Sequence, residues 1–216
     1  MIRGITIAPH SGFCFGVKRA TDRLEEKLSS KKQGERIFTL GNLIHNEIYM
    51  AMLERRGVSV IGLSDLEPIA ATATESSPVT VFIRAHGITK ETETLLFSLS
   101  EKNPYFSFED CTCPFVSRIH DIARDNSETD KFFILIGDPN HPECVGIMSW
   151  FDGDKFVFEN ENELDEFLKS SEFVKLHKKV PVVTAQTTKK PSQWQNCKEK
   201  IKKLYTKSIF FDTICN

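Results

Sequence analysis

The sequence predicts an α/β protein with small, mainly parallel sheets, and two observations carry this prediction. Short apolar runs typical of buried strands alternate with longer segments whose apolar residues recur at helical spacing. Cysteines and histidines directly follow several of the apolar runs, and in parallel sheets functional side chains gather at the carboxyl ends of strands. We therefore expect α/β lobes with a functional site where the strands end.

The alternation begins near the start of the chain. A strand is expected over residues 5–8 and a helix over residues 17–32, where apolar side chains recur every three or four positions. Residues 64–78 are small and polar and are expected to form a surface connection. The other elements expected in this half are strands over residues 37–40, 58–61 and 79–83, and helices over residues 47–56 and from Thr89 onward.

The second half of the chain repeats the same order of elements. Its strands are expected over residues 106–108, 132–136, 156–158, 180–184 and 209–211, and its helices over residues 114–124, 161–169 and 192–205. The two halves are therefore predicted to have similar architecture.

Composition and charge limit the classes of function. The chain has 216 residues and a formal net charge of −2, which argues against a general binder of nucleic acids or membrane surfaces. No apolar run approaches the roughly 18 residues that cross a bilayer, and residues 1–4 show no signal-peptide pattern. We therefore expect a cytoplasmic protein, in which cysteines act as metal ligands, catalytic thiols or buried fillers before they form disulfides.

Three of the six cysteines stand at near-equal intervals. Cys14, Cys113 and Cys215 lie 99 and then 102 residues apart (113 − 14 and 215 − 113), and each follows an expected strand. This spacing suggests lobes repeated around a common centre. Three thiolates there can hold zinc with an open fourth position or an iron–sulfur cluster, and the all-sulfur set favours the cluster. Unrelated buried cysteines are the alternative interpretation.

The other three cysteines have less regular places. Cys111 competes with Cys113 as a ligand, but Cys113 is favoured because Pro114 follows it and starts a helix. Cys144 and Cys197 are expected to fill apolar space.

Three histidines share one sequence context. His45, His86 and His141 each follow an apolar strand and precede a helix. Imidazoles at helix N-termini suit a phosphate or diphosphate, although one such histidine by itself is more often structural. The remaining histidines, His10, His120 and His177, lack this context and are expected to be superficial or incidental.

An acid and two hydroxyls complete the candidate site. Glu143 stands two residues after His141 and is expected either to act as a general acid or to cap the following helix. Thr187 and Thr188 follow another strand, where their hydroxyls can bond a substrate oxygen, cap a helix, or do both.

Together these motifs resemble the 4-hydroxy-3-methylbut-2-enyl diphosphate reductases, which act last in the non-mevalonate isoprenoid pathway. The matching segments occur in the family's order from Gly12 to the end of the sequence. They are Gly12-Phe13-Cys14-Phe15-Gly16-Val17, His45-Asn46, Arg84-Ala85-His86-Gly87, Thr112-Cys113-Pro114, residues 137–143, Gln186-Thr187-Thr188 and Asp212-Thr213-Ile214-Cys215. Cys111 and Cys144 are mild departures from the family pattern.

The resemblance implies a trefoil of three α/β lobes around a [4Fe-4S] cluster held by Cys14, Cys113 and Cys215. It places the first lobe at residues 15–112 and the second at residues 113–207, with residues 1–14 and 208–216 as remnants of a third. Family members continue well past the third cysteine. We therefore expect most of the third lobe to be missing and turnover by this chain alone to be weak or absent.

The resemblance also implies roles for the other candidate residues. Glu143 delivers protons, and the substrate is bound by His45, His86, His141, Gln186, Thr187 and Thr188. Two electrons from a ferredoxin or flavodoxin, with protons, remove the hydroxyl of the substrate as water and leave isopentenyl and dimethylallyl diphosphate. We expect a monomer or homodimer with no nucleic-acid or membrane partner. A non-catalytic remnant of this family and a three-cysteine zinc protein remain the alternatives.

Overall fold

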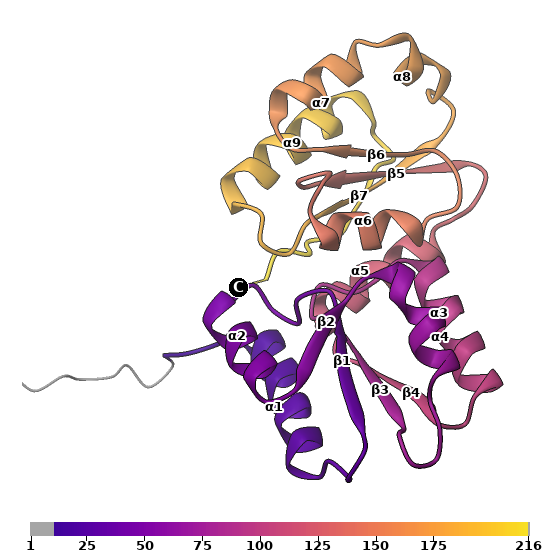
Figure 1. Cartoon of the computed structure of the whole chain (residues 1–216). Helices are drawn as coiled ribbons and strands as arrows, with labels where there is room; N and C mark the ends of the chain where they lie inside the picture. Colours follow the sequence, from indigo (N-terminus) through magenta and orange to yellow (C-terminus); the bar gives the residue numbers. More distant parts are fainter. Residues whose placement is uncertain (1–10, 216) are drawn as a thin grey trace, which may run out of the picture.

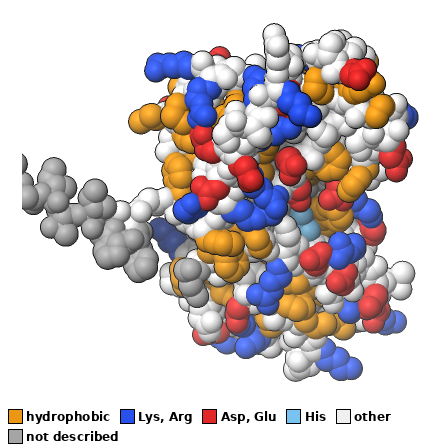
Figure 2. Space-filling model, turned by 90° about the horizontal axis from the view of Figure 1, so that it is seen from below, with side chains coloured by type: hydrophobic (Ala, Val, Ile, Leu, Met, Phe, Trp, Pro, Cys, Tyr) orange, Lys and Arg blue, Asp and Glu red, His pale blue; other side chains and the backbone are white. Residues whose placement is uncertain are grey.

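This computed structural model describes residues 11–215, which form two α/β lobes stacked end to end (Figure 1). The strand expected over residues 5–8 and His10 lie outside the described residues. No helix in the described range is both long and apolar enough to cross a membrane. On the face seen in Figure 2, acidic and basic side chains are interspersed, as the small net charge predicts.

The first lobe contains a parallel sheet with strand order β2-β1-β3-β4. All five residues of the apolar run Val79–Ile83 are buried, and this run forms the central strand β3. Val81 and Ile83 face a core that includes Leu96, whereas Phe82 faces a second core that includes Leu24. The elements of this lobe are α1 (Phe15–Ser29), β1 (Arg36–Leu40), α2 (Glu47–Arg55), β2 (Val58–Ile61), a 3-10 turn (Leu63–Asp65), α3 (Leu66–Ala71), β3 (Val79–Ile83), α4 (Lys90–Lys102) and β4 (Phe106–Asp110).

The second lobe repeats this arrangement, with parallel strand order β6-β5-β7-β8. Phe132 and Phe133 of β5 are fully buried and point into cores on opposite faces of the sheet. The elements are α5 (Pro114–Asp125), β5 (Lys131–Ile136), α6 (Pro142–Ser149), β6 (Lys155–Phe158), α7 (Glu161–Leu168), α8 (Ser171–Lys175), β7 (Val180–Ala185), α9 (Pro191–Leu204) and β8 (Ile209–Phe210). The predicted α/β class, the small parallel sheets and the similarity of the two halves are therefore confirmed.

One segment differs from the sequence-based expectation. Residues 64–78 contain the short helix α3, because Leu66 and Ala70 recur at helical spacing and are buried in the first core. At the end of the described chain, β8 pairs with β7, and the side chains of Phe210 and Phe211 pack on the two cores of the second lobe.

The lobes meet along α5 and α6, which lie at their junction in Figure 1. The indole Nε1 of Trp150 donates a hydrogen bond to the carbonyl oxygen of Ile88 at 3.3 Å. The amide of Lys90 donates to Ser149 Oγ at 2.9 Å, and its ammonium pairs with Asp152 at 2.9 Å. These contacts fix the loop after β3, which carries His86, against the C-terminal end of α6, the helix whose first turn contains Glu143.

Candidate functional site

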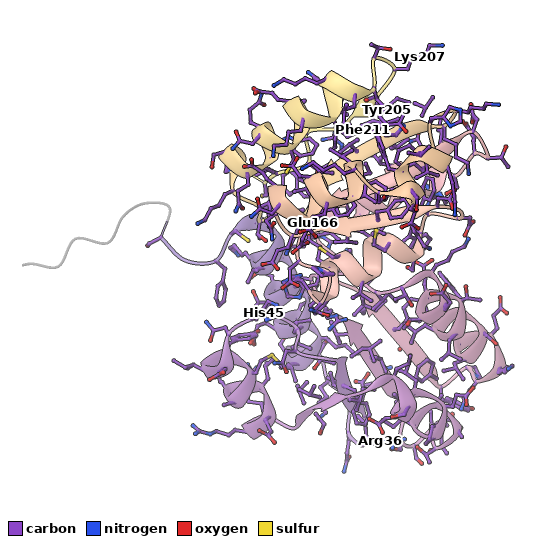
Figure 3. The ribbon with its side chains drawn as sticks, turned by 90° about the horizontal axis from the view of Figure 1, so that it is seen from above. Arg36, His45, Glu166, Tyr205, Lys207 and Phe211 are labelled. Carbon is purple, nitrogen blue, oxygen red and sulfur yellow. The ribbon has the colours of Figure 1, made fainter. Side chains whose placement is uncertain are left out.

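The candidate residues come together where strands of both sheets end. His45, His86 and Cys113 follow β1, β3 and β4, and Glu143, Thr187 and Cys215 follow β5, β7 and β8. In Figure 3, His45 lies near the junction of the lobes, far from Arg36 at the start of β1. A cavity of about 120 Å³ has walls from both lobes, lined by Cys14, Gly16, Val17, Ala85, His86, Cys113, Phe115, Val116, Glu143, Thr187, Thr188 and Cys215.

Cys14 and Cys113 occupy equivalent positions, because each is the residue directly before a helix. They precede α1 and α5, and neither side chain caps its helix, so both sulfur atoms are free to face the cavity. Burial, followed by the neighbouring Cys113 and Cys14, raises the pKa of Cys215, so the three thiols lie close enough to repel one another as thiolates. Such a set of sulfurs suits a positively charged metal centre.

Main-chain hydrogen bonds hold the cysteines in place. The amide of Cys113 donates to the carbonyl oxygen of Ala85 at 2.9 Å, and the amide of Cys215 donates to that of Thr187 at 2.8 Å. Thr213 reinforces the connection between Cys215 and Thr187, because its hydroxyl accepts a hydrogen bond from the amide of Ala185 and donates one to the carbonyl oxygen of the same residue. Each of these two cysteines is thus tied to the loop that carries another candidate residue.

Gly16 allows the close approach of α1 to Cys113. A Cβ atom at Gly16 would lie 2.4 Å from Cys113 Sγ, a distance that real contacts do not reach. The glycine of the Cys14-Phe15-Gly16 segment therefore leaves room for the sulfur.

The other cysteines do not line the cavity. Cys111, Cys144 and Cys197 are fully buried, and burial raises the pKa of each thiol, to about 12, about 12 and about 11. Cys111 Sγ faces the carbonyl oxygen of Ala20 instead of the cavity. These three residues behave as small apolar side chains.

The three histidines form one cluster. Nitrogen atoms of His45, His86 and His141 lie within 4.8 Å of one another, and the ring centroids are 4.2 Å apart for His45–His86 and 5.4 Å apart for His86–His141. Histidine is visible in a recess of the face shown in Figure 2. Burial, then His45, His141 and Arg84, lowers the pKa of His86 to about 3, and burial is also the main cause that lowers the pKa of His141. His86 and His141 are therefore neutral at pH 7.

The low pKa of His86 predicts how stability depends on pH. Below pH 6.5 the unfolded chain binds a proton at this residue, whereas the folded chain does so only near pH 3. The free energy of unfolding is therefore expected to fall as the pH drops from 6.5 towards 3. Denaturant unfolding of His86→Asn should show a shallower loss over this range, and His177→Asn, at an exposed histidine, serves as the control. Parallel curves for the unmodified protein and His86→Asn would contradict the prediction.

The hydrogen bonding of His141 distinguishes an anion site from a metal site. The amide of Glu143 donates to His141 Nδ1 at 3.1 Å. A neutral imidazole that accepts at Nδ1 carries its proton on Nε2, which makes Nε2 a donor and not a metal ligand. The cluster is thus prepared to donate hydrogen bonds to an anion.

Glu143 is the buried acid of the site, and Thr187 orients it. The carboxyl group accepts from the amide of Thr187 at 2.6 Å and from the Thr187 hydroxyl at 2.8 Å, and the glutamate is only 2% exposed. Burial raises the pKa of Glu143, and the two hydrogen bonds from Thr187 partly oppose this effect. A raised pKa in a cavity favours the protonated carboxyl that a general acid requires.

The remaining candidates differ in their contacts. Gln186 directs its side-chain oxygen to the amide of Asp138 at 3.1 Å and so fixes the loop before His141, while Thr188 lines the cavity and is exposed. His120 is not superficial as expected: it is 7% exposed and stacks on Trp150 with ring centroids 5.3 Å apart. Its position four residues after the buried Val116 in α5 is the only sequence signal of this burial.

Comparison with known proteins gives a consistent result. The model of the LytB protein family matches residues 5–216. A 4-hydroxy-3-methylbut-2-enyl diphosphate reductase of Thermoanaerobacter sp. (strain X514) is 35% identical over 212 residues, which are 98% of this chain and 67% of the relative. A protein of the same name from Clostridium acetobutylicum is 32% identical over 215 residues, which are 100% of this chain and 30% of the relative. The chain thus spans about two thirds of the first relative and under a third of the second.

Solved structures agree with this assignment. A structure of (E)-4-hydroxy-3-methyl-but-2-enyl diphosphate reductase matches 98% of this chain and 68% of its own length, with a TM-score of 0.74 and 30% identity. The fold is also shared by a structure of the E-1-hydroxy-2-methyl-but-2-enyl-4-diphosphate reductase from Plasmodium falciparum. That structure matches 96% of this chain and 59% of its own length, with a TM-score of 0.77 and 24% identity. The chain therefore belongs to the LytB family, the family of reductase enzymes that these relatives represent.

Proposed function

We propose that this chain holds a [4Fe-4S] cluster and takes part in the two-electron reduction of 4-hydroxy-3-methylbut-2-enyl diphosphate. One observation carries the proposal: a single cavity joins three cysteines to the Glu143–Thr187 pair, and His86 extends it to the histidine cluster. In the balanced reaction two electrons and two protons enter, the C–O bond to the hydroxyl breaks, a C–H bond forms, and water leaves. The products are isopentenyl and dimethylallyl diphosphate.

The cysteines would hold the cluster, and the structure supports the fit in two ways. The side chains of Cys14, Cys113 and Cys215 face one cavity from three separate elements, and Gly16 leaves space beside Cys113 Sγ. The donor set consists of three soft sulfurs, which suits iron–sulfur chemistry. When bound, such a cluster supplies electrons and an iron without a protein ligand that acts as a Lewis acid.

The histidine cluster would bind the diphosphate. His141 donates from Nε2, since its Nδ1 is occupied by the amide of Glu143. The ring of His45 lies 4.2 Å from that of His86 and 5.5 Å from that of His141, centroid to centroid, so the three rings would present their N–H groups to one anion. The hydroxyl end of the substrate is then directed towards the cysteine cavity that His86 also lines.

Glu143 would deliver the proton. The two hydrogen bonds from Thr187 orient the carboxyl group, and burial keeps a proton on it at a higher pH than in water. Its position between His141 and the cysteines suits transfer to a substrate bound across both sites. Gln186 and Thr188 have supporting roles, Gln186 by holding the loop before His141 and Thr188 at the cavity wall.

The proposal extends to partners and organisation. A ferredoxin or flavodoxin would supply the electrons in the cytoplasm, to a monomer or homodimer. The lobes would comprise residues 15–112 and 113–207, and the flanking residues would belong to a third lobe that joins the second lobe through the pairing of β8 with β7.

Cysteine substitution tests the metal site directly. After anaerobic reconstitution the unmodified chain is expected to be brown, with thiolate-to-iron charge-transfer absorbance and bound iron. Cys14→Ser, Cys113→Ser and Cys215→Ser are each expected to lose most of this absorbance and iron, because each removes one of three ligands. Cys197→Ser, at a buried cysteine outside the cavity, is the matched control and should retain both. Colourless protein with stoichiometric zinc would instead identify a zinc protein, and iron binding unaffected by all three substitutions would refute the site.

A further inference from the structure

Arg84 is a charged residue that the candidate mechanism does not use. It directly follows β3, two residues before His86, and its side chain is half-buried. It lines a cavity of about 260 Å³ that is distinct from the cysteine cavity, together with Leu40, Gly41, Ile61, Gly62, Leu63, Ile88, Thr89 and Thr92. None of these neighbours carries a negative charge.

Among residues 11–215, the guanidinium of Arg84 has no carboxylate partner. Its Nε donates to the carbonyl oxygen of Gly87 at 3.3 Å, and within residues 11–215 no carboxylate pairs with it and neither Nη atom forms a hydrogen bond. Burial lowers the pKa of Arg84, although a guanidinium keeps its charge at neutral pH. Within residues 11–215 the guanidinium therefore lies beside a cavity that has no acidic neighbour, and its charge can attract an anion there.

The backbone makes room for this charge beside the loop that leads to His45. Gly41 follows β1 directly and has a φ of 69°, and a Cβ atom there would lie 3.2 Å from Arg84 Nη1. A side chain at this position would be strained and would crowd the guanidinium. The charge is therefore held at the ends of β1 and β3, the two strands that lead into His45 and His86.

The histidine cluster needs a positive charge nearby if it is to attract an anion from a distance. His86 and His141 are neutral at pH 7, so they donate hydrogen bonds but do not attract an anion over a distance. Arg84 stands two residues before His86 on the loop that follows β3, and its charge contributes to the lowered pKa of both His86 and His141, whereas Asp138 raises the pKa of His141. A diphosphate group with several negative charges would be attracted mainly by Arg84.

We propose that Arg84 supplies the fixed positive charge that draws a diphosphate group to the His45–His86–His141 cluster. This inference rests on the proposed function of the cluster and assigns to Arg84 a role in affinity, not in bond breaking. Because the role is electrostatic, it is screened by salt and requires charge more than the shape of the guanidinium.

The test measures binding of inorganic diphosphate to the purified chain by calorimetry at low and high ionic strength. Arg84→Gln is expected to weaken binding about tenfold at low salt, with a smaller difference at high salt, whereas Arg84→Lys should retain most of the affinity. Arg55→Gln is the control. Arg55 is exposed in α2, and its side chain forms no hydrogen bond within residues 11–215, so this variant loses the same charge and should bind diphosphate like the unmodified chain.

Other outcomes separate this inference from the proposed function. Equal losses in Arg84→Gln and Arg84→Lys that salt does not change would assign the effect to the contact with Gly87 and overturn the inference. Unchanged binding by Arg84→Gln, together with loss of binding by His86→Asn, would overturn the inference and leave the diphosphate site intact. Absence of binding by the unmodified chain at low salt would overturn both.

Discussion

Replacement of Glu143 by glutamine is expected to lower reductive turnover by about 10²–10⁴-fold, the range typical for loss of a positioned general acid. Glutamine has nearly the same shape and still accepts from the amide of Thr187, but it has no proton to transfer. The rate should be measured on cluster-loaded protein with a chemically reduced donor. Glu93→Gln is the matched control, since burial also raises the pKa of this half-buried glutamate, which lies outside the cysteine cavity.

The stability of the same variant distinguishes a chemical effect from unfolding. Because the pKa of Glu143 is raised above 4.5 in the folded protein, the folded state holds the proton more tightly than the unfolded state. The stabilising contribution of this proton is fully present below pH 4.5 and is lost as the pH rises through the folded-state pKa. Glu143→Gln is therefore expected to unfold at higher denaturant concentration than the unmodified protein at about pH 8, with a difference that shrinks towards about pH 4. A variant that is inactive and also less stable at the higher pH would contradict the assignment.

Much of the fold was predictable because local signals and tertiary packing agree. The run Val79–Ile83 is apolar throughout except for Thr80, and it forms a central strand that is buried on both faces. Cys113 followed by Pro114 indicates a helix start, and Cys113 precedes α5 as expected. The near-equal spacing of the cysteines also reflects the structure, since the two lobes have equivalent strand orders.

The remaining features depend on contacts that no local pattern specifies. The pairing of β8 with β7 requires an unfilled sheet edge and two phenylalanines that reach separate cores. The hydrogen bond of Gln186 to Asp138 joins residues from two strand exits, so sequence spacing gives no sign of it. The burial of His120 depends on Trp150 of the same lobe and on the absence of a side chain at Gly87 of the first lobe, and Gly87 becomes its neighbour only when the lobes dock.

Gly87 fixes the loop that carries His86, and its replacement by alanine is expected to lower stability strongly. Its φ is 76°, where a side chain is strained by about 1–2 kcal/mol. A Cβ atom there would also lie 2.7 Å from His120 Cε1 and 3.2 Å from Thr112 Cγ2. Overpacking of this kind typically costs about 1–3 kcal/mol more. We therefore expect Gly87→Ala to lower the free energy of unfolding by roughly 2–5 kcal/mol in denaturant titrations.

A matched glycine separates the two contributions. Gly57 has a similar φ of 80°, but its nearest neighbour would be Lys31 Nζ at 3.8 Å, so Gly57→Ala should show the backbone strain alone, about 1–2 kcal/mol. His120 cannot easily retreat, because its ring is stacked on Trp150, which in turn bonds to Ile88. If the contact is the cause, adding His120→Ala should make the loss from Gly87→Ala similar to that from Gly57→Ala. Equal losses in the two single alanine variants would show that the contact with His120 adds nothing to the backbone strain and would contradict the prediction.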